Sequence, residues 1–462
     1  MGLIFPLITF PYASRILLPE GIGKVNFANS IISYFAIISS LGIATYGTRE
    51  VSKVRDNEYL LAKITKELLL INIISTIIAY LFFIVSFLLI PKFSDYKVLL
   101  VICSTTLLLN TLGINWLYNG LEEYEYIAIR SMVFQFISLI FLFIFVKTKN
   151  DYVKYAAIGI FSSAGSNICN IIHSKKFINY RKSIKYDIAI HIKPILILFA
   201  SSLAVSVFTI LDTSMLGFLS TDIQIGYYSA ASKITRMIRD IFPAIFTVLF
   251  ARLSLYSSKG EKNKIIDLTN ETMNFILCFS IPIVCGINIL SKPLILLLCG
   301  YDYMPAIKTL NSLSPLIIIS SCSGYLGGQL LISQGKEFYY LITVTISAIM
   351  DIILNLILIN RFGAFGAGLA TFITELLIFI IYLFMVRNIM KKINIIAPLF
   401  QYLISSIFMS VTVYFISRIF NSTIPKLLIS TISGIIVYFV LLLLFKNNFI
   451  IKLLQIIHII KK

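Results

Sequence analysis

Long apolar runs constrain this chain more than any other feature of its sequence. Runs of about 20 residues recur from end to end, and each is long enough to cross about 30 Å of hydrocarbon as a helix. The runs at 68–90 and 372–386 are continuously apolar and show no alternation with period two, which disfavours the strands of a membrane β-barrel. With 58% hydrophobic and 13% charged residues, the chain has too little polar surface for a soluble fold. We therefore predict an all-α polytopic membrane protein.

Charged, proline and asparagine residues divide the apolar runs into separate helices. Lysine and arginine are more than twice as frequent in the loops on one side of these helices as on the other, and the positive-inside rule places that side, with both chain termini, in the cytoplasm. The loop at 122–126 holds three glutamates and no cation, but acidic residues influence topology little. We predict about 14 transmembrane helices, over residues 1–18, 26–47, 68–90, 98–118, 127–146, 153–173, 194–218, 226–250, 272–290, 306–332, 339–359, 365–386, 398–417 and 426–445.

The most basic of the predicted cytoplasmic loops follows the sixth helix and suggests how the helices are grouped. Two short segments on the predicted outer side, 18–23 and 219–226, also resemble each other, since each precedes a helix that begins with aromatic and small residues. Chance and an internal repeat, as in many transporters, explain this likeness equally well. We predict two six-helix lobes and a final helix pair: an N-lobe (1–173), a basic connector (174–193), a C-lobe (194–388) and a C-terminal pair with a basic tail (389–462).

Signatures of soluble enzymes and of metal sites are absent from the sequence. There is no GxxxxGK[ST], no HExxH and no Cys/His metal spacing, and the predicted outer loops are too short for a catalytic domain. The glycines at 363–368 open an apolar helix with no strand before it, which favours helix packing over nucleotide binding. The six cysteines lie in or beside apolar runs, and the net charge of +18 arises in loops. We expect no enzyme activity, no metal or cofactor, no disulfides and no nucleic-acid partner.

Several cations are predicted to lie within the membrane, where a charge costs several kcal/mol unless it faces a cavity or a partner. Arg15 lies in the outer half of the first helix. Helix spacing puts Lys233, Arg236 and Asp240 on one stripe of the eighth helix, with Arg239 turned aside. This stripe lies near the middle of the membrane.

Two interpretations of these cations remain open. In the structural one, Lys233 pairs with Asp212 and Arg236 pairs with Asp240, which leaves the other two cations unpaired. In the functional one, the cations line a cavity between the two halves that receives a phosphate or diphosphate, because arginine and lysine are natural partners of phosphate oxygens.

Other polar residues have weaker claims to function. Arg49 and Glu50, at the cytoplasmic end of the second helix, form either an inner gate or an interfacial anchor. Asn26, Asn29 and Tyr228 begin two helices at similar depth and are candidates to hydrogen-bond sugar hydroxyls, although interfacial anchoring explains the tyrosine equally well. We interpret a last set of polar residues as structural rather than as coupling-ion sites: Asp351, Asn355 and Glu375.

Prolines occur in the two helices that carry the cations. Pro6 and Pro11 are predicted to interrupt the first helix before Arg15, and Pro243 is predicted to interrupt the eighth after Asp240. Proline removes a backbone hydrogen bond and bends a membrane helix, so these helices are expected to be bent.

Three sequence blocks resemble a known family. The segments PLITFPYASRIL at 6–17 and PEGIG at 19–23 resemble the opening of the Wzx-type polysaccharide repeat-unit flippases. The second block, YGTREVSKVRD, lies at 46–56, and the third combines LDTSMLG at 211–217 with GYY at 226–228. Family members usually begin earlier, with a lysine-bearing stub, so we expect an internal start or a truncation here.

The resemblance implies a fold and a function. The fold is that of the multidrug/oligosaccharidyl-lipid/polysaccharide exporters, with two six-helix lobes in a V and alternating access. The implied substrate is an undecaprenyl-diphosphate-linked oligosaccharide, moved from the inner to the outer leaflet of the bacterial cytoplasmic membrane for surface polysaccharide synthesis. In such flippases cavity cations hold the diphosphate, and Arg15 and Lys233 occupy matching positions. Membrane lipids surround the protein, and a polysaccharide polymerase is a further expected partner.

Three alternatives remain. A lipid II flippase of the same fold is the closest, although its first helix normally holds a second arginine where this chain reads LLPE at 17–20. A drug exporter of this fold would favour acidic cavity residues. A membrane polymerase or ligase acting on lipid-linked glycans belongs to another class and is disfavoured by the short outer loops.

Overall fold

The computed structural model describes residues 4–180 and 185–460, and within these ranges the regular structure is helical throughout, with no strand. Ten helices of this described part are long and apolar enough to cross a membrane. Large apolar side chains on them are exposed, for example Leu88 at 77% and Leu444 at 71%. Apolar surface on this scale requires a lipid environment, which confirms the prediction of an all-α polytopic membrane protein.

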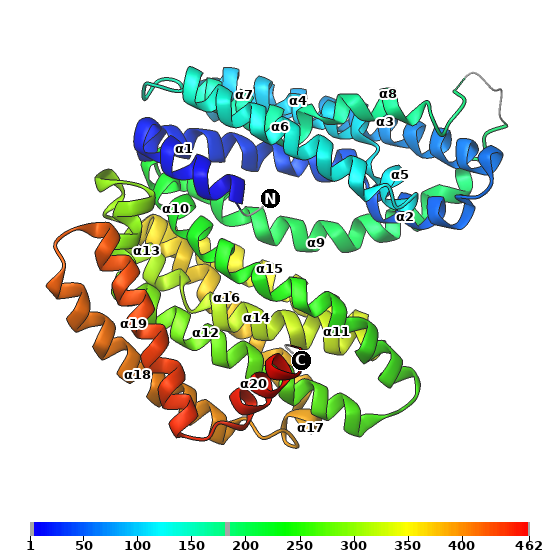
Figure 1. The fold of residues 1–462 in the computed structure, drawn as a ribbon. Coiled ribbons are helices and arrows are strands. Elements are labelled where there is room, and N and C mark those ends of the chain that lie inside the picture. Colours follow the sequence, from blue (N-terminus) through cyan, green and yellow to red (C-terminus); the bar gives the residue numbers. More distant parts are fainter. Residues whose placement is uncertain (1–3, 181–184, 461–462) are drawn as a thin grey trace. The chain divides into compact units, whose positions relative to one another are not determined.

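The chain divides into two compact units at Gly226. In unit 1 (Met1–Gly226), α1 forms the centre, because it packs on α3, α4 and α9. Figure 1 shows the long helices of this unit lying roughly along a common axis. The elements of unit 1 are α1 (Ile4–Ser40), α2 (Ile43–Val54), α3 (Glu58–Leu89), the 3-10 helix η1 (Pro91–Tyr96), α4 (Lys97–Gly113), α5 (Asn115–Gly120), α6 (Tyr124–Phe145), α7 (Tyr152–Ile160), the π-helix η2 (Phe161–Gly165), α8 (Asn167–Ser174), α9 (Ala189–Leu219) and the start of α10 (Asp222–Arg239).

Unit 2 (Tyr227–Lys462) is built around α12. The antiparallel pair α18 and α19 packs on this helix, and Tyr438 anchors the pair by donating to the Cys278 carbonyl at 2.7 Å. Besides the rest of α10, its elements are α11 (Ile241–Ser258), α12 (Lys262–Leu298), the 3-10 helix η3 (Tyr301–Tyr303), α13 (Ala306–Leu313), α14 (Leu316–Tyr325), the π-helix η4 (Leu326–Leu331), α15 (Glu337–Phe362), α16 (Ala364–Met385), α17 (Arg387–Met390), α18 (Ile396–Ile419), α19 (Thr423–Leu444) and α20 (Asn448–Ile460).

The break in α1 lies where the sequence predicts an outer turn. Leu18 has φ 59° and ψ 175°, outside the helical region, and separates two helical segments. Pro19 then begins the second segment, where its fixed φ suits a first helical position and its missing N–H leaves no bond unmade. The second helix of the prediction therefore starts several residues earlier than expected.

The expected interruption at Pro6 and Pro11 is wrong, because α1 stays helical from Ile4 through Pro11 and breaks only at Leu18. Pro6 lies in the first turn, where the backbone N–H has no helical acceptor in any case. Pro11 is accommodated inside the helix, as is common in membrane helices. The break near Pro243 is confirmed, since α10 ends at Arg239 and α11 starts at Ile241.

Each of the 14 predicted segments contains helix in the described part of the chain, but ten spans meet the length and hydropathy that a membrane crossing needs, so the exact helix number stays a prediction. The division at Gly226 groups α9 with the helices before it, and the two-lobe division also stays a prediction. Arg181 and Lys182 of the basic connector lie outside the described residues. All six cysteines are free.

Candidate functional site

Arg15 lies on an exposed side of the first segment of α1. The opposite side of the helix is packed, since Ala13 and Ser14 are 0% exposed. Tyr12 fixes this turn of the helix by donating to the Val146 carbonyl at 2.9 Å, and Ser14 donates to the Pro11 carbonyl. A rigid, anchored helix therefore presents the Arg15 guanidinium away from the core of unit 1.

The two outer turns that resemble each other in sequence lie in direct contact. A Cβ placed on Gly23 would approach the Asp222 carbonyl oxygen to 1.8 Å, and one placed on Gly226 would approach the Pro19 carbonyl oxygen to 2.1 Å. Both distances are far below van der Waals contact, so each glycine allows the other turn's backbone to approach. We call this reciprocal contact the glycine junction.

Polar side chains close the glycine junction. Tyr96 donates to the Asp222 carboxylate at 2.5 Å, and Lys92 donates to the Gly217 carbonyl. Burial raises the pKa of Asp222, and the hydrogen bond from Tyr96 acts in the opposite direction. Sequence reasoning missed these contacts, because Lys92 and Tyr96 lie 125 and 126 residues before their partners Gly217 and Asp222.

Asn26 and Asn29 follow the junction on α1. Asn26 is half-buried and Asn29 is exposed, and the Ser33 hydroxyl donates to the Asn29 carbonyl at 2.7 Å. Nearby, Tyr34 and Ser214 share a hydrogen bond of 2.7 Å, which joins α1 to α9 beside the buried Asp212. Three of the predicted polar residues are thus positioned by one packed helix pair.

The remaining predicted cations lie on α10 in unit 2. Lys233 is half-buried, Arg236 is exposed and Arg239 is half-buried. Tyr228, at 2% exposed, packs into the interior of the protein, and its predicted role toward the substrate stays a prediction.

Arg239 lies near two carboxylates, which corrects the expectation that the structural interpretation leaves this residue unpaired. Its Nε is 3.9 Å from Asp240, and its charge acts on the Glu375 carboxylate of α16. The helical stripe does not predict the first contact, because it pairs Asp240 with Arg236 one turn earlier, whereas the contact joins two consecutive residues at the end of α10. Ser323 donates to Glu375 at 3.3 Å, so this carboxylate is held by both α10 and α14.

Arg49 and Glu50 form an ion pair of 3.0 Å on α2. Lys53, one turn further along, pairs with the same carboxylate at 2.9 Å, and the Arg49 guanidinium lies over the Tyr46 ring. All these charges belong to one helix, and this local pairing favours the interfacial anchor. The gate role stays a prediction.

Unit 1 also contains a buried arginine that sequence reasoning missed. Arg130 of α6 is 8% exposed and donates to the side-chain oxygens of Asn115, at 3.2 Å, and Asn170. Asn170 in turn donates to Asn115 at 3.1 Å, so the three side chains form a closed network. The available signal was a lone arginine in an apolar run, with asparagines in the neighbouring runs.

Unit 2 contains a buried aspartate in a comparable setting. Asp351 of α15 is 0% exposed, and its two oxygens accept from Asn355 at 3.1 Å and from Thr374 at 3.2 Å. The network joins α15 to α16, which supports the structural interpretation of Asp351 and Asn355.

A third buried network joins three helices of unit 1. Glu67 accepts from His191 at 3.0 Å, and the other ring nitrogen of His191 lies 2.8 Å from the Tyr46 hydroxyl. Glu67 also accepts from the Asp187 backbone N–H at 2.6 Å. Because all three side chains are buried, we assign the network to holding α2, α3 and α9 together. Among the described residues, no group of three or more His, Cys, Asp or Glu could hold a metal ion.

The chain matches the model of a known protein family. The family described as polysaccharide biosynthesis proteins matches residues 1–256, which is more than half of the chain. The chain belongs to this family. The match extends through unit 1 and α10, and so includes every candidate site residue named above from Arg15 to Arg239.

Similar full-length proteins support the same relationship for this polysaccharide biosynthesis protein. It is 25% identical over 395 residues to a protein of Escherichia coli (strain K12) named as an O-antigen transporter, covering 83% of this chain and 93% of that one. A protein of the same name from Shigella dysenteriae is 25% identical, covering 81% and 94%. A protein of Haloferax volcanii named as a low-salt glycan biosynthesis flippase is 27% identical over 35% of this chain and 34% of its own. These findings confirm the predicted resemblance to Wzx-type flippases.

Two solved structures share the fold. The inward closed conformation of the lipid II flippase MurJ has a TM-score of 0.69 at 20% identity and covers 97% of this chain and 99% of its own. An inward-facing multidrug resistance transporter of the MATE family has a TM-score of 0.65 at 12% identity and covers 85% and 96%. At these identities the likeness establishes the fold.

Proposed function

We propose that this polysaccharide biosynthesis protein is a flippase that moves undecaprenyl-diphosphate-linked oligosaccharide repeat units from the inner to the outer leaflet of the bacterial cytoplasmic membrane. The observation that carries the proposal is the match over 93% of a protein named as an O-antigen transporter. The exporter fold supports transport by alternating access. Both termini are cytoplasmic in this proposal, in accordance with the positive-inside rule.

We assign the diphosphate to the cations of α1 and α10. Arg15, Lys233, Arg236 and Arg239 are guanidinium or ammonium groups on membrane helices, and a phosphate oxygen is the ligand that best repays the cost of keeping them there. The exposure of Arg15 and Arg236 supports this assignment, since both groups are accessible at the surface of their helices.

Other residues receive secondary roles. Asn26, Asn29 and Tyr228 are assigned to the sugar hydroxyls. Coupling or gating is assigned to three further charged residues: Asp212, Arg49 and Glu50. A polysaccharide polymerase would consume the flipped repeat unit.

A lipid II flippase is the second candidate, favoured by the structural likeness to MurJ over 97% of the chain. The two substrates share a lipid diphosphate and differ in the attached sugar. The cationic residues therefore suit both candidates, and the deciding measurement concerns which lipid-linked glycan accumulates when the protein is lost.

Deletion of the gene tests both candidates. Intact lipid-linked repeat units should accumulate in the inner leaflet, with lipid II unchanged, whereas accumulation of lipid II would select the second candidate. Complementation by Arg15→Ala should fail at a normal protein level. Arg252→Ala, which changes an exposed arginine on α11, serves as the matched control and should restore export. Unpolymerised glycan at the outer surface would instead show that flipping is intact and that an enzyme step is missing.

A further inference from the structure

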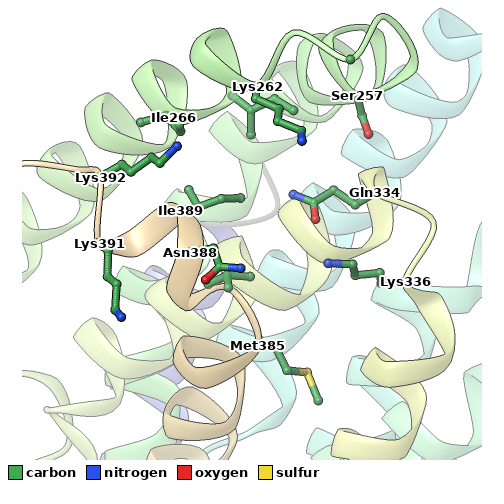
Figure 2. Close-up of a pocket in the computed structure, with 13 residues that line it drawn as sticks. Ser257, Lys262, Ile266, Gln334, Lys336, Met385, Asn388, Ile389, Lys391 and Lys392 are labelled. Carbon is green, nitrogen blue, oxygen red and sulfur yellow. The ribbon is translucent and has the colours of Figure 1, made fainter.

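A pocket of about 740 Å³ lies at one end of unit 2, apart from the candidate residues above. Figure 2 shows its lining, which comes from the α11–α12 turn, the η4–α15 turn and the region around α17. Four lysines contribute to it, and the described residues of the lining include no aspartate or glutamate. We call it the lysine pocket, with Lys262, Lys336, Lys391 and Lys392 as its cations.

The side chains in the lysine pocket are arranged to bind an anion. In Figure 2 the Lys262 and Lys336 ammonium groups and the Gln334 amide point into the same space, which Asn388 faces from the other side, whereas Lys391 points away. Each of the two inward-pointing lysines has an acidic neighbour in sequence that does not line the pocket: Glu261, which pairs with Lys264 at 2.9 Å, and the exposed Glu337 at the start of α15.

Two helix termini add to the positive potential. Lys262 is the first residue of α12, which has 37 residues, and Lys336 immediately precedes α15, which has 26 residues. The amino-terminal end of a long helix carries a partial positive charge from its unpaired N–H groups. Lysines and helix termini together favour a compact anion such as a phosphate group.

The pocket lies at the level where the membrane helices begin and end. Three candidate spans have an end there: Lys262–Leu298 and Glu337–Phe362 start beside it, and Ala364–Met385 finishes at it. Its wall is partly apolar, with Ile265 and Val386 only 7% and 3% exposed. Cationic groups above an apolar wall match the boundary between a lipid headgroup and its glycerol region.

We propose that the lysine pocket binds a phosphate-bearing anion at the membrane surface. Two sources share this chemistry, the headgroup of an anionic phospholipid and a soluble phosphate compound, and the apolar wall favours the phospholipid. The site does not depend on which lipid-linked glycan the protein carries.

Lipid titration of the purified full-length protein in neutral detergent tests the proposal. The probes are dioleoyl-phosphatidylglycerol, dioleoyl-phosphatidylcholine and inorganic phosphate, and bound lipid is counted by native mass spectrometry. Phosphatidylglycerol should bind in preference to phosphatidylcholine, whose headgroup carries no net charge. If inorganic phosphate displaces phosphatidylglycerol when present in modest excess, the source is soluble phosphate; if it does not, the source is the lipid.

A matched pair of double variants locates the binding. K262Q/K336Q removes the two ammonium groups that point into the pocket, whereas R252Q/K259Q removes the same charge from two exposed residues, one on α11 and one in the turn after it, that do not line the pocket. Affinity for the bound anion should fall about tenfold or more in the first variant, because it removes the two cations that point into the pocket. It should stay within about twofold in the second.

Two results would overturn the proposal. Equal loss in both double variants would assign the effect to diffuse surface charge. A wild-type protein that neither prefers phosphatidylglycerol to phosphatidylcholine nor binds inorganic phosphate would show that the pocket takes no phosphate-bearing anion. Thermal unfolding of each lipid-free variant establishes that the folded proteins are being compared.

Discussion

The two units bury charges of opposite sign in similar surroundings. In unit 1 the guanidinium of Arg130 donates to the amide oxygens of Asn115 and Asn170, and in unit 2 the carboxylate of Asp351 accepts from Asn355 and Thr374. Neutral dipoles thus solvate a cation in one unit and an anion in the other. Hydrogen bonds from neutral dipoles lower the cost of keeping an ionisable side chain inside a membrane protein.

The largest effect is expected from Arg130→Leu. The change removes two charge-assisted hydrogen bonds and takes the arginine donor away from the Asn170 side-chain oxygen, while Asn115 keeps its donor from Asn170. The free energy of unfolding should therefore fall by about 4 kcal/mol. The measurement is the thermal unfolding midpoint in detergent together with the protein level in the membrane. The matched control, Arg252→Leu on the exposed face of α11, should change little. Equal loss from both variants would show that the network around Arg130 has no special weight.

A smaller effect is expected in unit 2. Asp351→Leu leaves the Asn355 and Thr374 donors unsatisfied and should cost about 3 kcal/mol, whereas Asp351→Asn keeps an acceptor and should cost about 1 kcal/mol. Denaturant unfolding in detergent distinguishes the two values. If Asp351→Asn is as unstable as Asp351→Leu, then the negative charge itself holds α15 to α16, and the parallel with Arg130 fails.

The sequence predicts the elements better than it predicts these networks. Apolar runs locate the helices because membrane thickness determines their length, and Pro19 with its neighbours marks the turn that breaks α1. The partner of Arg130 cannot be found in this way, since Asn170 lies 40 residues further along the chain and only the packing within unit 1 brings the two together.

The candidate site shows the same limit. Arg15 and Lys233 stand out as charges in apolar runs, which one sequence is enough to reveal. The contact of Arg239 is with the next residue, Asp240, rather than with a residue one turn away, and the glycine junction depends on two turns about 200 residues apart. Neither feature has a periodic signal.

Each unit has a buried tyrosine that donates a hydrogen bond to a buried backbone carbonyl. Tyr118 donates to the Asn170 carbonyl at 2.6 Å, and Tyr438 donates to the Cys278 carbonyl at 2.7 Å. Replacing either by phenylalanine removes one hydrogen bond to a buried carbonyl and should lower the free energy of unfolding by about 1 kcal/mol. Unfolding midpoints that differ strongly between the two variants would reveal that one unit relaxes around the lost bond and the other does not.

The smallest effect is a pH dependence within unit 1. Burial raises the pKa of Asp222, so its contribution to stability is present below its unfolded pKa and is lost as pH rises through the folded pKa. Hydrogen bonds from Lys154 and from the backbone of Lys147 and Thr148 hold the pKa of Asp151 well below its usual range, so its contribution is lost as pH falls.

The two aspartates should therefore respond in opposite directions. Relative to wild type, Asp222→Asn should become more favourable as pH rises from about 4 to about 8, and Asp151→Asn should become less favourable over the acidic end of that range. Unfolding midpoints of both variants across the range check the signs. A shift of the same sign in both variants would contradict the assigned causes.

The glycine junction distinguishes turns that look equally suitable for the insertion of a tag. At Gly23 and Gly226 the neighbouring backbone already occupies the space that one added methyl group would need. An epitope or fluorescent tag inserted at either turn of the glycine junction should therefore force the two turns apart. Gly260 and Gly335 have open space around them and accept φ values of +68° and +71°, so their turns offer room for a reporter. Insertion tolerance thus follows the backbone contacts of each turn rather than its position between helices.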